Sequence, residues 1–245
     1  MNTKQIISVL VVIVIAGGVW WFLAKAPAPA PMTTPQTVQA STFNEDAQYS
    51  TIKVEYPTAP AKERAAIEAE IDKDIADFRQ SVAGLDATVM PSLADGHKLE
   101  FVAGYKEYHS TDTSSYFYTI FEDTGGAHPN AYFKTFVFDK DGNRIGIKDV
   151  VGPDLTKLSQ LVRADVLKQM EDRLGFGPDK TTLSADGLPD SSYGFYAEGT
   201  EPKEENFQDF VIDGDTLVIE IPPYQVAAYV MGSFEVRIPL SDINH

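Results

Sequence analysis

Residues 124–130, which read TGGAHPN, place a histidine beside paired glycines and between two aromatic-rich segments. An imidazole can act as a general base, a metal ligand or a recognition group near neutral pH. Paired glycines give the backbone access to positive φ, and an asparagine adds an amide donor and acceptor. We therefore expect a binding site here, formed by Gly125, Gly126, His128 and Asn130. The alternative is a shaped hairpin loop whose histidine hydrogen-bonds only locally.

A second candidate segment, residues 222–232, reads PPYQVAAYVMG and lies between two predicted strands. Tyrosines are frequent interface anchors because the ring packs while the hydroxyl stays in water. We expect Tyr224, Gln225 and Tyr229 to contribute to binding. The alternative is a buried crossover that closes the core.

The remaining sequence offers little for metal, cofactor or covalent chemistry. The four histidines show neither HxxxH nor HxH spacing, and the chain has no cysteine. Residues 139–143, DKDGN, faintly resemble a calcium loop but lack its later carboxylates, so we predict a turn. GxSxG and phosphate-binding glycine motifs are absent from the sequence. We expect no cofactor and no metal site, while the 36 carboxylates leave a glycosidase-like pair open.

Two amphipathic helices are expected to position these segments. Apolar residues recur at helical spacing over residues 61–82, and again over 154–174 behind Asp154 as N-cap. Residues 178–205 are polar and turn-rich, so we predict a surface segment with little regular structure. The fold class is α+β, a largely antiparallel sheet with two amphipathic helices. Period-two alternation predicts its strands at residues 49–56, within an antiparallel meander over 97–148, and at 207–212, 216–221 and 234–239.

The acidic net charge limits the classes of partner that this chain can bind. The chain carries a formal net charge of −16, from 36 acidic and 20 basic residues. Such an acidic chain is unsuited to nucleic acid and to anionic lipid headgroups. It is compatible with a cationic protein partner or with divalent cations, and the simplest alternative role of the charge is solubility.

The N-terminus predicts a membrane anchor. Residues 6–24 form an uninterrupted apolar run, long enough to span the hydrocarbon core of a bilayer. Trp20 and Trp21 near its end suit the interfacial belt. We predict a single-pass, uncleaved anchor over residues 1–25 with a minimal cytoplasmic tail and an extracytoplasmic, periplasmic or extracellular C-terminal domain. The alternative is a cleaved signal peptide, with Ala24-Lys25-Ala26 as the cleavage pattern.

Two further segments complete the predicted organisation. Residues 26–42 are rich in Pro, Ala and Thr, which predicts an extended linker. Residues 43–245 then form the extracytoplasmic α+β domain, either as one body or with sub-parts 43–148 and 149–245.

Five segments together carry a family resemblance. They are YxxIxVxYP from Tyr49, TGGAH from Thr124, NFxxF from Asn206, PYQVA from Pro223 and VxIP from Val236. In this order they resemble the extracytoplasmic domain shared by lysozyme-sensing anti-sigma factors of the RsiV type and peptidoglycan deacetylases of the PdaC type. That region is otherwise described as adjoining domains of unknown function. The resemblance covers residues 49–243, and Ala228 stands where the family pattern has proline.

The resemblance implies an outer domain that, in the sensors, binds lysozyme, a cationic protein. A sensor also needs a cytoplasmic domain, for which residues 1–5 are too short, and a deacetylase needs a separate metal-binding catalytic domain, which we do not recognise here. We therefore expect a non-enzymatic, membrane-anchored binding module of the bacterial cell envelope, with a lysozyme-like protein or peptidoglycan as ligand. The alternatives are an envelope hydrolase that uses His128 and nearby carboxylates, and a structural accessory subunit.

Overall fold

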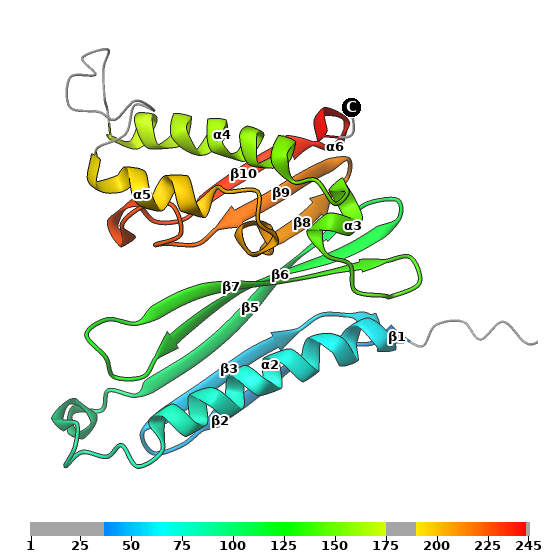
Figure 1. Ribbon diagram of the computed structural model, residues 1–245. Helices are drawn as coiled ribbons and strands as arrows, with labels where there is room; N and C mark the ends of the chain where they lie inside the picture. The colour runs from blue at the N-terminus through cyan, green and yellow to red at the C-terminus, as the bar shows by residue number, and fades with distance from the viewer. Residues whose placement is uncertain (1–36, 175–189, 244–245) are drawn as a thin grey trace, which may run out of the picture. The chain divides into compact units, whose positions relative to one another are not determined.

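The computed structural model describes residues 37–174 and 190–243 (Figure 1). The predicted membrane anchor, residues 1–25, lies outside these residues, as does most of the predicted linker. Within the described part of the chain, no helix is both long and apolar enough to cross a membrane. Thr37–His245 form one compact unit.

A five-stranded sheet forms the first half of this unit, in the order β2-β3-β5-β6-β7. Neighbouring strands are antiparallel except β3 and β5, which pair in parallel with Ile52 opposite Phe101. A parallel pair needs a long crossover, and helix α2 lies within that connection. The strands are β2 (Ser41–Asp46), β3 (Ser50–Tyr56), β5 (Leu99–His109), β6 (Thr113–Asp123) and β7 (Asn130–Asp139), while the short β1 (Thr37–Val38) pairs with β4 (Ala59–Pro60).

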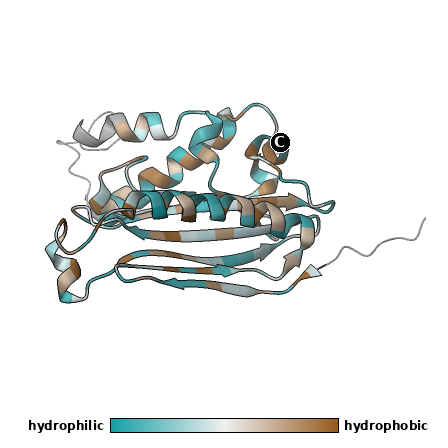
Figure 2. Ribbon diagram, turned by 90° about the horizontal axis from the view of Figure 1, so that it is seen from below, coloured by the Kyte–Doolittle hydropathy of each residue, from teal (hydrophilic) through white to brown (hydrophobic). Residues whose placement is uncertain are grey.

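Helix α2 (Ala61–Val82) covers one face of this large sheet. Figure 2 shows hydrophilic and hydrophobic residues alternating along it, as expected for a helix with one buried stripe. Ile67, Ile71 and Phe78 are fully buried, and the Phe78 ring centre lies 5.7 Å from that of Phe101 in β5. The helix predicted over residues 61–82 is confirmed.

A three-stranded sheet in the order β10-β9-β8 forms the second half. Helix α4 covers one of its faces, and Val162 and Val166 share a core there with Phe234. The N–H of Thr156 donates to Asp154 Oδ1 at 2.9 Å, in line with the predicted capping role of that aspartate. The elements are α3 (Ile147–Val151), α4 (Thr156–Leu174), α5 (Asp190–Gly199), β8 (Phe210–Asp213), β9 (Thr216–Ile221), β10 (Phe234–Pro239) and α6 (Leu240–Ile243), with 3₁₀ turns η1 (Pro91–Asp95), η2 (Glu204–Phe207) and η3 (Tyr229–Met231).

The two sheets meet through their other faces. Phe117 of β6 packs in a small buried cluster with Val211 and Val218 of the small sheet. Two backbone N–H groups of β8 donate to side chains of the large sheet, Ile212 to Ser115 Oγ at 3.2 Å and Phe210 to Thr135 Oγ1 at 3.3 Å. The layers are therefore α2, large sheet, small sheet, and then α4 with α5 (Figure 1).

The predicted surface segment at residues 178–205 is partly wrong. Residues 190–199 form helix α5, and η2 follows at the end of the segment. Tyr196 anchors α5 because its buried hydroxyl donates to the Arg163 carbonyl of α4 at 2.8 Å. The part of the segment before α5 lies outside the described residues. Strands β1 and β2 also begin within the stretch predicted as linker.

The α+β class, with mostly antiparallel sheets and two main helices, is confirmed. The turn predicted at residues 139–143 is confirmed as well. Asp139 Oδ1 accepts the N–H groups of Asp141 and Asn143, and the Lys62 ammonium donates to the Asp141 carbonyl and to Asn143 Oδ1. Two oxygens that a cation could have used, the Asp141 carbonyl and Asn143 Oδ1, therefore contact a lysine.

Candidate binding surface

The β6–β7 loop, residues 124–130, is shaped around Gly125. This residue has a φ of 81°, in the left-handed region that favours glycine. A Cβ at this position would stand 2.0 Å from Met90 Cε. The Gly125 N–H donates to Asp123 Oδ1 at 2.9 Å, while Asp123 Oδ2 lies 3.1 Å from His97 Nε2. Three features therefore fix the shape of the loop. They are the positive φ of Gly125, the Met90 side chain close to it, and the Asp123 carboxylate that accepts its N–H.

His128 lies near the end of this loop. Its Nδ1 is 2.9 Å from the Pro129 carbonyl, and because a carbonyl only accepts, Nδ1 carries the proton in this contact. The imidazole stacks on Tyr229, with ring centres 5.3 Å apart and planes 27° apart. Within the described residues, the histidines that pair with carboxylates are His97 and His109. The carboxylate partner that a His128 hydrolase would need is therefore not seen in that part of the chain.

The β9–β10 loop, residues 222–232, supplies two tyrosines. The Tyr224 ring centre lies 5.4 Å from that of Tyr229. Tyr224 is 55% exposed and Tyr229 is 42% exposed, so both rings are open to solvent. Tyr224 has a φ of 73° although it is not glycine, a conformation that costs about 1–3 kcal/mol and often occurs at functional positions. His128, Tyr229 and Tyr224 form what we call the aromatic row.

Hydrogen bonds from neighbouring elements hold the β9–β10 loop in place. Arg173 of α4 donates to the Met231 carbonyl at 2.6 Å and to the Ser233 carbonyl at 2.9 Å. The Gln225 amide nitrogen donates to two backbone carbonyls, those of Gly199 and Asn206, each at 2.9 Å. The loop is therefore a rigid support for the exposed tyrosines.

The predicted site residues take different places in this arrangement. His128, Tyr224 and Tyr229 come together from two loops. Gly125 and Gly126 shape the first loop, and a Cβ on Gly126 would have its nearest neighbour only at 3.9 Å. Asn130 begins β7 opposite Glu122 and is exposed. Gln225 braces the second loop through its amide nitrogen, whereas we expected it to face a ligand.

An acidic pair lies at the base of the second loop, and the sequence did not reveal it. Glu220 of β9 is directly opposite Glu235 of β10. Glu220 is half-buried, whereas the Glu235 side chain is 47% exposed and lies 3.5 Å from the Arg237 guanidinium. Burial and the neighbouring Glu235 charge raise the pKa of Glu220 from 4.5 to about 7. Period-two alternation shows which face of a strand a residue occupies. The residue opposite it depends on the strand register, which the length of the β9–β10 loop does not determine here.

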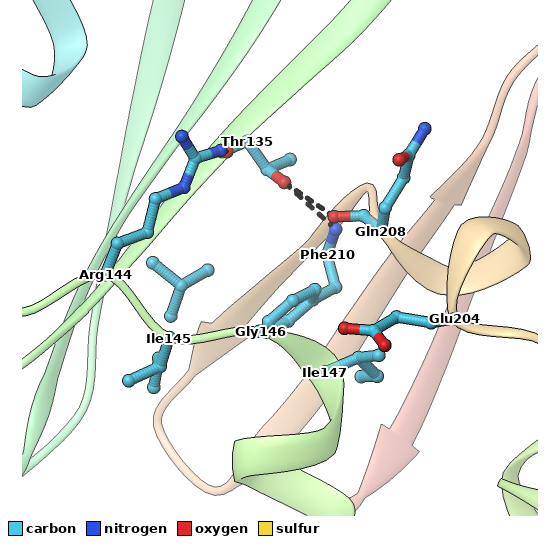
Figure 3. Close-up of a pocket in the computed structure, with 9 residues that line it drawn as sticks. Thr135, Arg144, Ile145, Gly146, Ile147, Glu204, Gln208 and Phe210 are labelled. Atoms are coloured by element: carbon cyan, nitrogen blue, oxygen red, sulfur yellow. Dashed lines mark hydrogen bonds between the residues drawn. The ribbon is translucent and has the colours of Figure 1, made fainter.

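A polar recess lies away from these loops, between β7 and the chain around η2. Figure 3 shows Thr135, Arg144, Glu204, Gln208 and Phe210 around a cavity of about 140 Å³. A second cavity, of about 180 Å³, shares Thr135, Arg144 and Gln208 with it. Arg144, which lines both cavities, is already partnered, since its guanidinium pairs with Glu70 and donates to the Thr135 carbonyl at 2.8 Å. None of the predicted site residues lines either cavity.

The described residues hold no group of three or more His, Asp or Glu side chains arranged as metal ligands. Burial raises the pKa of Asp209, beside the second cavity, from 3.8 to about 6, and Lys134 opposes this shift. What the surface offers chemically is therefore stacking and hydrogen bonding by the aromatic row.

The second half of the chain matches a known family. Residues 148–241 match the family described as a protein of unknown function, DUF3298. We call this matched segment the DUF3298 domain. It contains the small sheet, α4 and the β9–β10 loop, and therefore the two tyrosines of the aromatic row.

One curated relative extends the similarity beyond the DUF3298 domain. Peptidoglycan-N-acetylmuramic acid deacetylase PdaC of Bacillus subtilis is 27% identical over 210 residues, which are 83% of this chain and 40% of that protein. The chain thus spans less than half the length of that relative. The resemblance to PdaC-type proteins and to domains of unknown function is confirmed.

Two solved DUF3298 family structures share the fold. The protein from Bacteroides fragilis has a TM-score of 0.52 at 14% identity, with 84% of this chain and 91% of that chain covered. The protein from Pseudomonas aeruginosa has a TM-score of 0.51 at 12% identity, with 86% and 94% covered. At these identities the likeness extends to the fold alone.

Proposed function

We propose that this chain is a membrane-anchored, non-enzymatic binding module of the bacterial cell envelope. Its ligand is a lysozyme-like cationic protein or peptidoglycan itself. The similarity to a peptidoglycan deacetylase supports the envelope setting, and the apolar run at residues 6–24 supports the anchor. The DUF3298 domain faces outward in this proposal, in the periplasm or the extracellular space.

The observation that carries the proposal is the aromatic row. Exposed aromatic rings on a rigid support bind ligands with little loss of conformational entropy. His128 and Tyr229 contact each other across two loops, and Arg173 and Gln225 hold the second loop. Tyr224 has a positive φ, and its ring is open to solvent next to Tyr229. Exposed rings with hydroxyl groups are features of a recognition surface.

Both proposed ligand classes fit this surface. A pyranose ring presents an apolar C–H face to an aromatic ring, while the phenol hydroxyls can hydrogen-bond to sugar hydroxyls. A cationic protein would place lysine or arginine against the tyrosine rings and against the acidic chain, whose formal charge is −16. Salt distinguishes the two ligand classes, because screening weakens binding to a cationic protein far more than binding to the glycan.

The test is retention of the intact protein by purified peptidoglycan sacculi and, separately, by immobilised hen egg-white lysozyme. Raising the salt from roughly 0.01 M to 0.15 M shortens the Debye length from roughly 30 Å to 8 Å. We expect retention by lysozyme to fall over this range if the ligand is a cationic protein, and retention by sacculi to persist if it is the glycan. Retention by neither at low salt would contradict the proposal.

A further inference from the structure

The face of the large sheet that lies toward the small sheet is only partly covered. Phe117 of β6 marks the covered part, because it packs with Val211 and Val218 and is 6% exposed. Side chains alternate along a strand, so Thr119 and Phe121 lie on the same face of β6 as Phe117. Thr119 is exposed, and Phe121 is 37% exposed. The small sheet therefore covers the junction and leaves the part of this face nearer the β6–β7 loop open to solvent.

The open part of this face extends over three neighbouring strands. The strand register places two residues of each strand side by side here. We call them the open strip, which consists of Val102 and Gly104 of β5, Thr119 and Phe121 of β6, and Ala131 and Phe133 of β7. The strip continues from the buried junction, since the Phe133 ring centre lies 5.0 Å from that of Phe117. It is largely apolar, carries one hydroxyl group and has no charged side chain.

The open strip leads to the aromatic row. Strands β6 and β7 are joined by the β6–β7 loop, whose His128 stacks on Tyr229 of the β9–β10 loop. Val230, the next residue, is 90% exposed and adds an apolar side chain to that loop. The two loops, residues 124–130 and 222–232, contain no Asp, Glu, Lys or Arg. The strip and the two loops are thus adjoining parts of a surface that offers aromatic rings, hydroxyls and amides.

This lack of charge contrasts with the rest of the chain, whose formal charge is −16. Acidic side chains are concentrated elsewhere, for example on helix α2, where Asp72 and Asp77 are exposed. A cationic protein would be attracted to such carboxylates. The open strip and the two loops offer it none, so their chemistry suits an uncharged ligand.

The border of the open strip carries both signs of charge. On the same face, the charged residues at neighbouring positions of β3 and β5 are Lys53, Glu100 and Lys106. The small sheet adds Glu220 and Glu235 near the junction, and Glu235 lies 3.5 Å from the Arg237 guanidinium. Because cations and carboxylates are both present, this border does not select a cationic partner.

We propose that the open strip extends the aromatic row into an elongated binding site for a linear, uncharged polysaccharide strand, so that the ligand is a glycan and not a cationic protein. That the row binds an envelope ligand at all rests on the proposed function. Successive sugar rings present apolar C–H faces to Phe121 and the tyrosines. Their hydroxyl groups can hydrogen-bond to the Thr119 hydroxyl and to the exposed Asn130 amide. These polar groups distinguish the surface from one that would take an apolar protein segment.

The test uses a defined sugar, a linear β-1,4-linked hexamer of N-acetylglucosamine, and measures its affinity for the intact protein by calorimetry. We expect Phe121→Ala to lower this affinity by about tenfold, as is typical for an aromatic contact of this kind. The matched control is Phe43→Ala, which also removes a ring that is 37% exposed, but from β2, and it should bind as the natural protein does. The affinity should change little between roughly 0.01 M and 0.15 M salt.

Three results would overturn the proposal, and they separate it from the proposed function. Equal affinity of Phe121→Ala and the natural protein, with a loss in Tyr229→Ala, would show that the row binds sugar without the strip. Binding of hen egg-white lysozyme without binding of the hexamer would show a protein ligand. Either result leaves the proposed function standing, whereas binding of neither these two ligands nor sacculi would overturn both.

A second variant covers the case in which Phe121→Ala does not fold. Ala131 is an exposed residue of the open strip on the edge strand β7. Ala131→Glu places a carboxylate on this uncharged surface and must weaken binding of the hexamer. Unchanged affinity in that folded variant would also overturn the proposal.

Discussion

His128 and Tyr229 stack on each other with ring centres 5.3 Å apart, although one belongs to the β6–β7 loop and the other to the β9–β10 loop. The contact joins the large sheet to the DUF3298 domain at the surface. Their buried junction lies elsewhere, at Phe117, Val211 and Val218. The aromatic row therefore depends on how the two sheets are placed, and a ligand that bridges both loops would contact both halves of the fold.

Replacement of Gly125 by alanine should destabilise the protein. The residue combines a φ of 81° with a Cβ position 2.0 Å from Met90 Cε. We expect a loss of about 1–3 kcal/mol in the free energy of unfolding, measured by urea denaturation. The control Gly126→Ala has open space around its Cβ and no positive φ, so it should change stability little. Equal losses in the two variants would contradict the account of this loop.

Replacement of Arg173 by alanine should loosen the β9–β10 loop. The variant loses two hydrogen bonds from a charged donor to loop carbonyls and the packing of the guanidinium on Phe234, whose ring centre is 4.0 Å away. We expect chymotrypsin to cleave after Tyr224 or Tyr229 faster by on the order of tenfold. Lys168→Ala, which removes an exposed cation from the same helix, should leave the rate unchanged. A normal cleavage rate in Arg173→Ala would show that the loop is held by other contacts.

Stability should depend on pH through Glu220. Its pKa is about 7 in the folded protein against an ordinary 4.5, so the folded state binds more protons than the unfolded state between these values. The contribution to stability is fully present below about pH 4.5 and is lost as the pH rises to about 7. We expect Glu220→Gln to gain about 1–2 kcal/mol relative to the natural protein at about pH 8, after discounting for solvent screening. Parallel pH profiles of unfolding for the two proteins would contradict the assigned pKa shift.

Helix α2 was predictable because its apolar residues recur regularly, at Ile67, Ile71, Ile75 and Phe78, and all four are buried. Helix α5 was not, because it is short and contains two glycines, which disfavour an isolated helix. Its stability comes from tertiary packing of Tyr196 on α4. Strand β2 was missed for a similar reason, since its residues are nearly all exposed and show no alternation.

The candidate site was predictable in its residue types and not in its contacts. Loop position and side-chain chemistry indicated His128, Tyr224 and Tyr229, but only the placement of the sheets shows that they form one row. Gln225 is a polar residue of a type that can contact a ligand. It instead holds the β9–β10 loop in place, because its amide nitrogen donates to two backbone carbonyls. Arg173 carried no sequence signal, since a helical arginine is most often solvent-exposed.

The central claim is that the aromatic row binds an envelope component, and the most direct measurement compares Tyr229→Ala with Tyr229→Phe. Retention of each intact variant is measured on purified sacculi and on immobilised hen egg-white lysozyme. We expect Tyr229→Ala to lose at least about tenfold in affinity for whichever of the two retains the natural protein, as is typical for an aromatic anchor. Tyr229→Phe keeps the stacked ring and should lose much less, and Phe43→Ala, which removes an exposed ring from β2, should lose nothing. Unchanged binding by a folded Tyr229→Ala variant would contradict the claim.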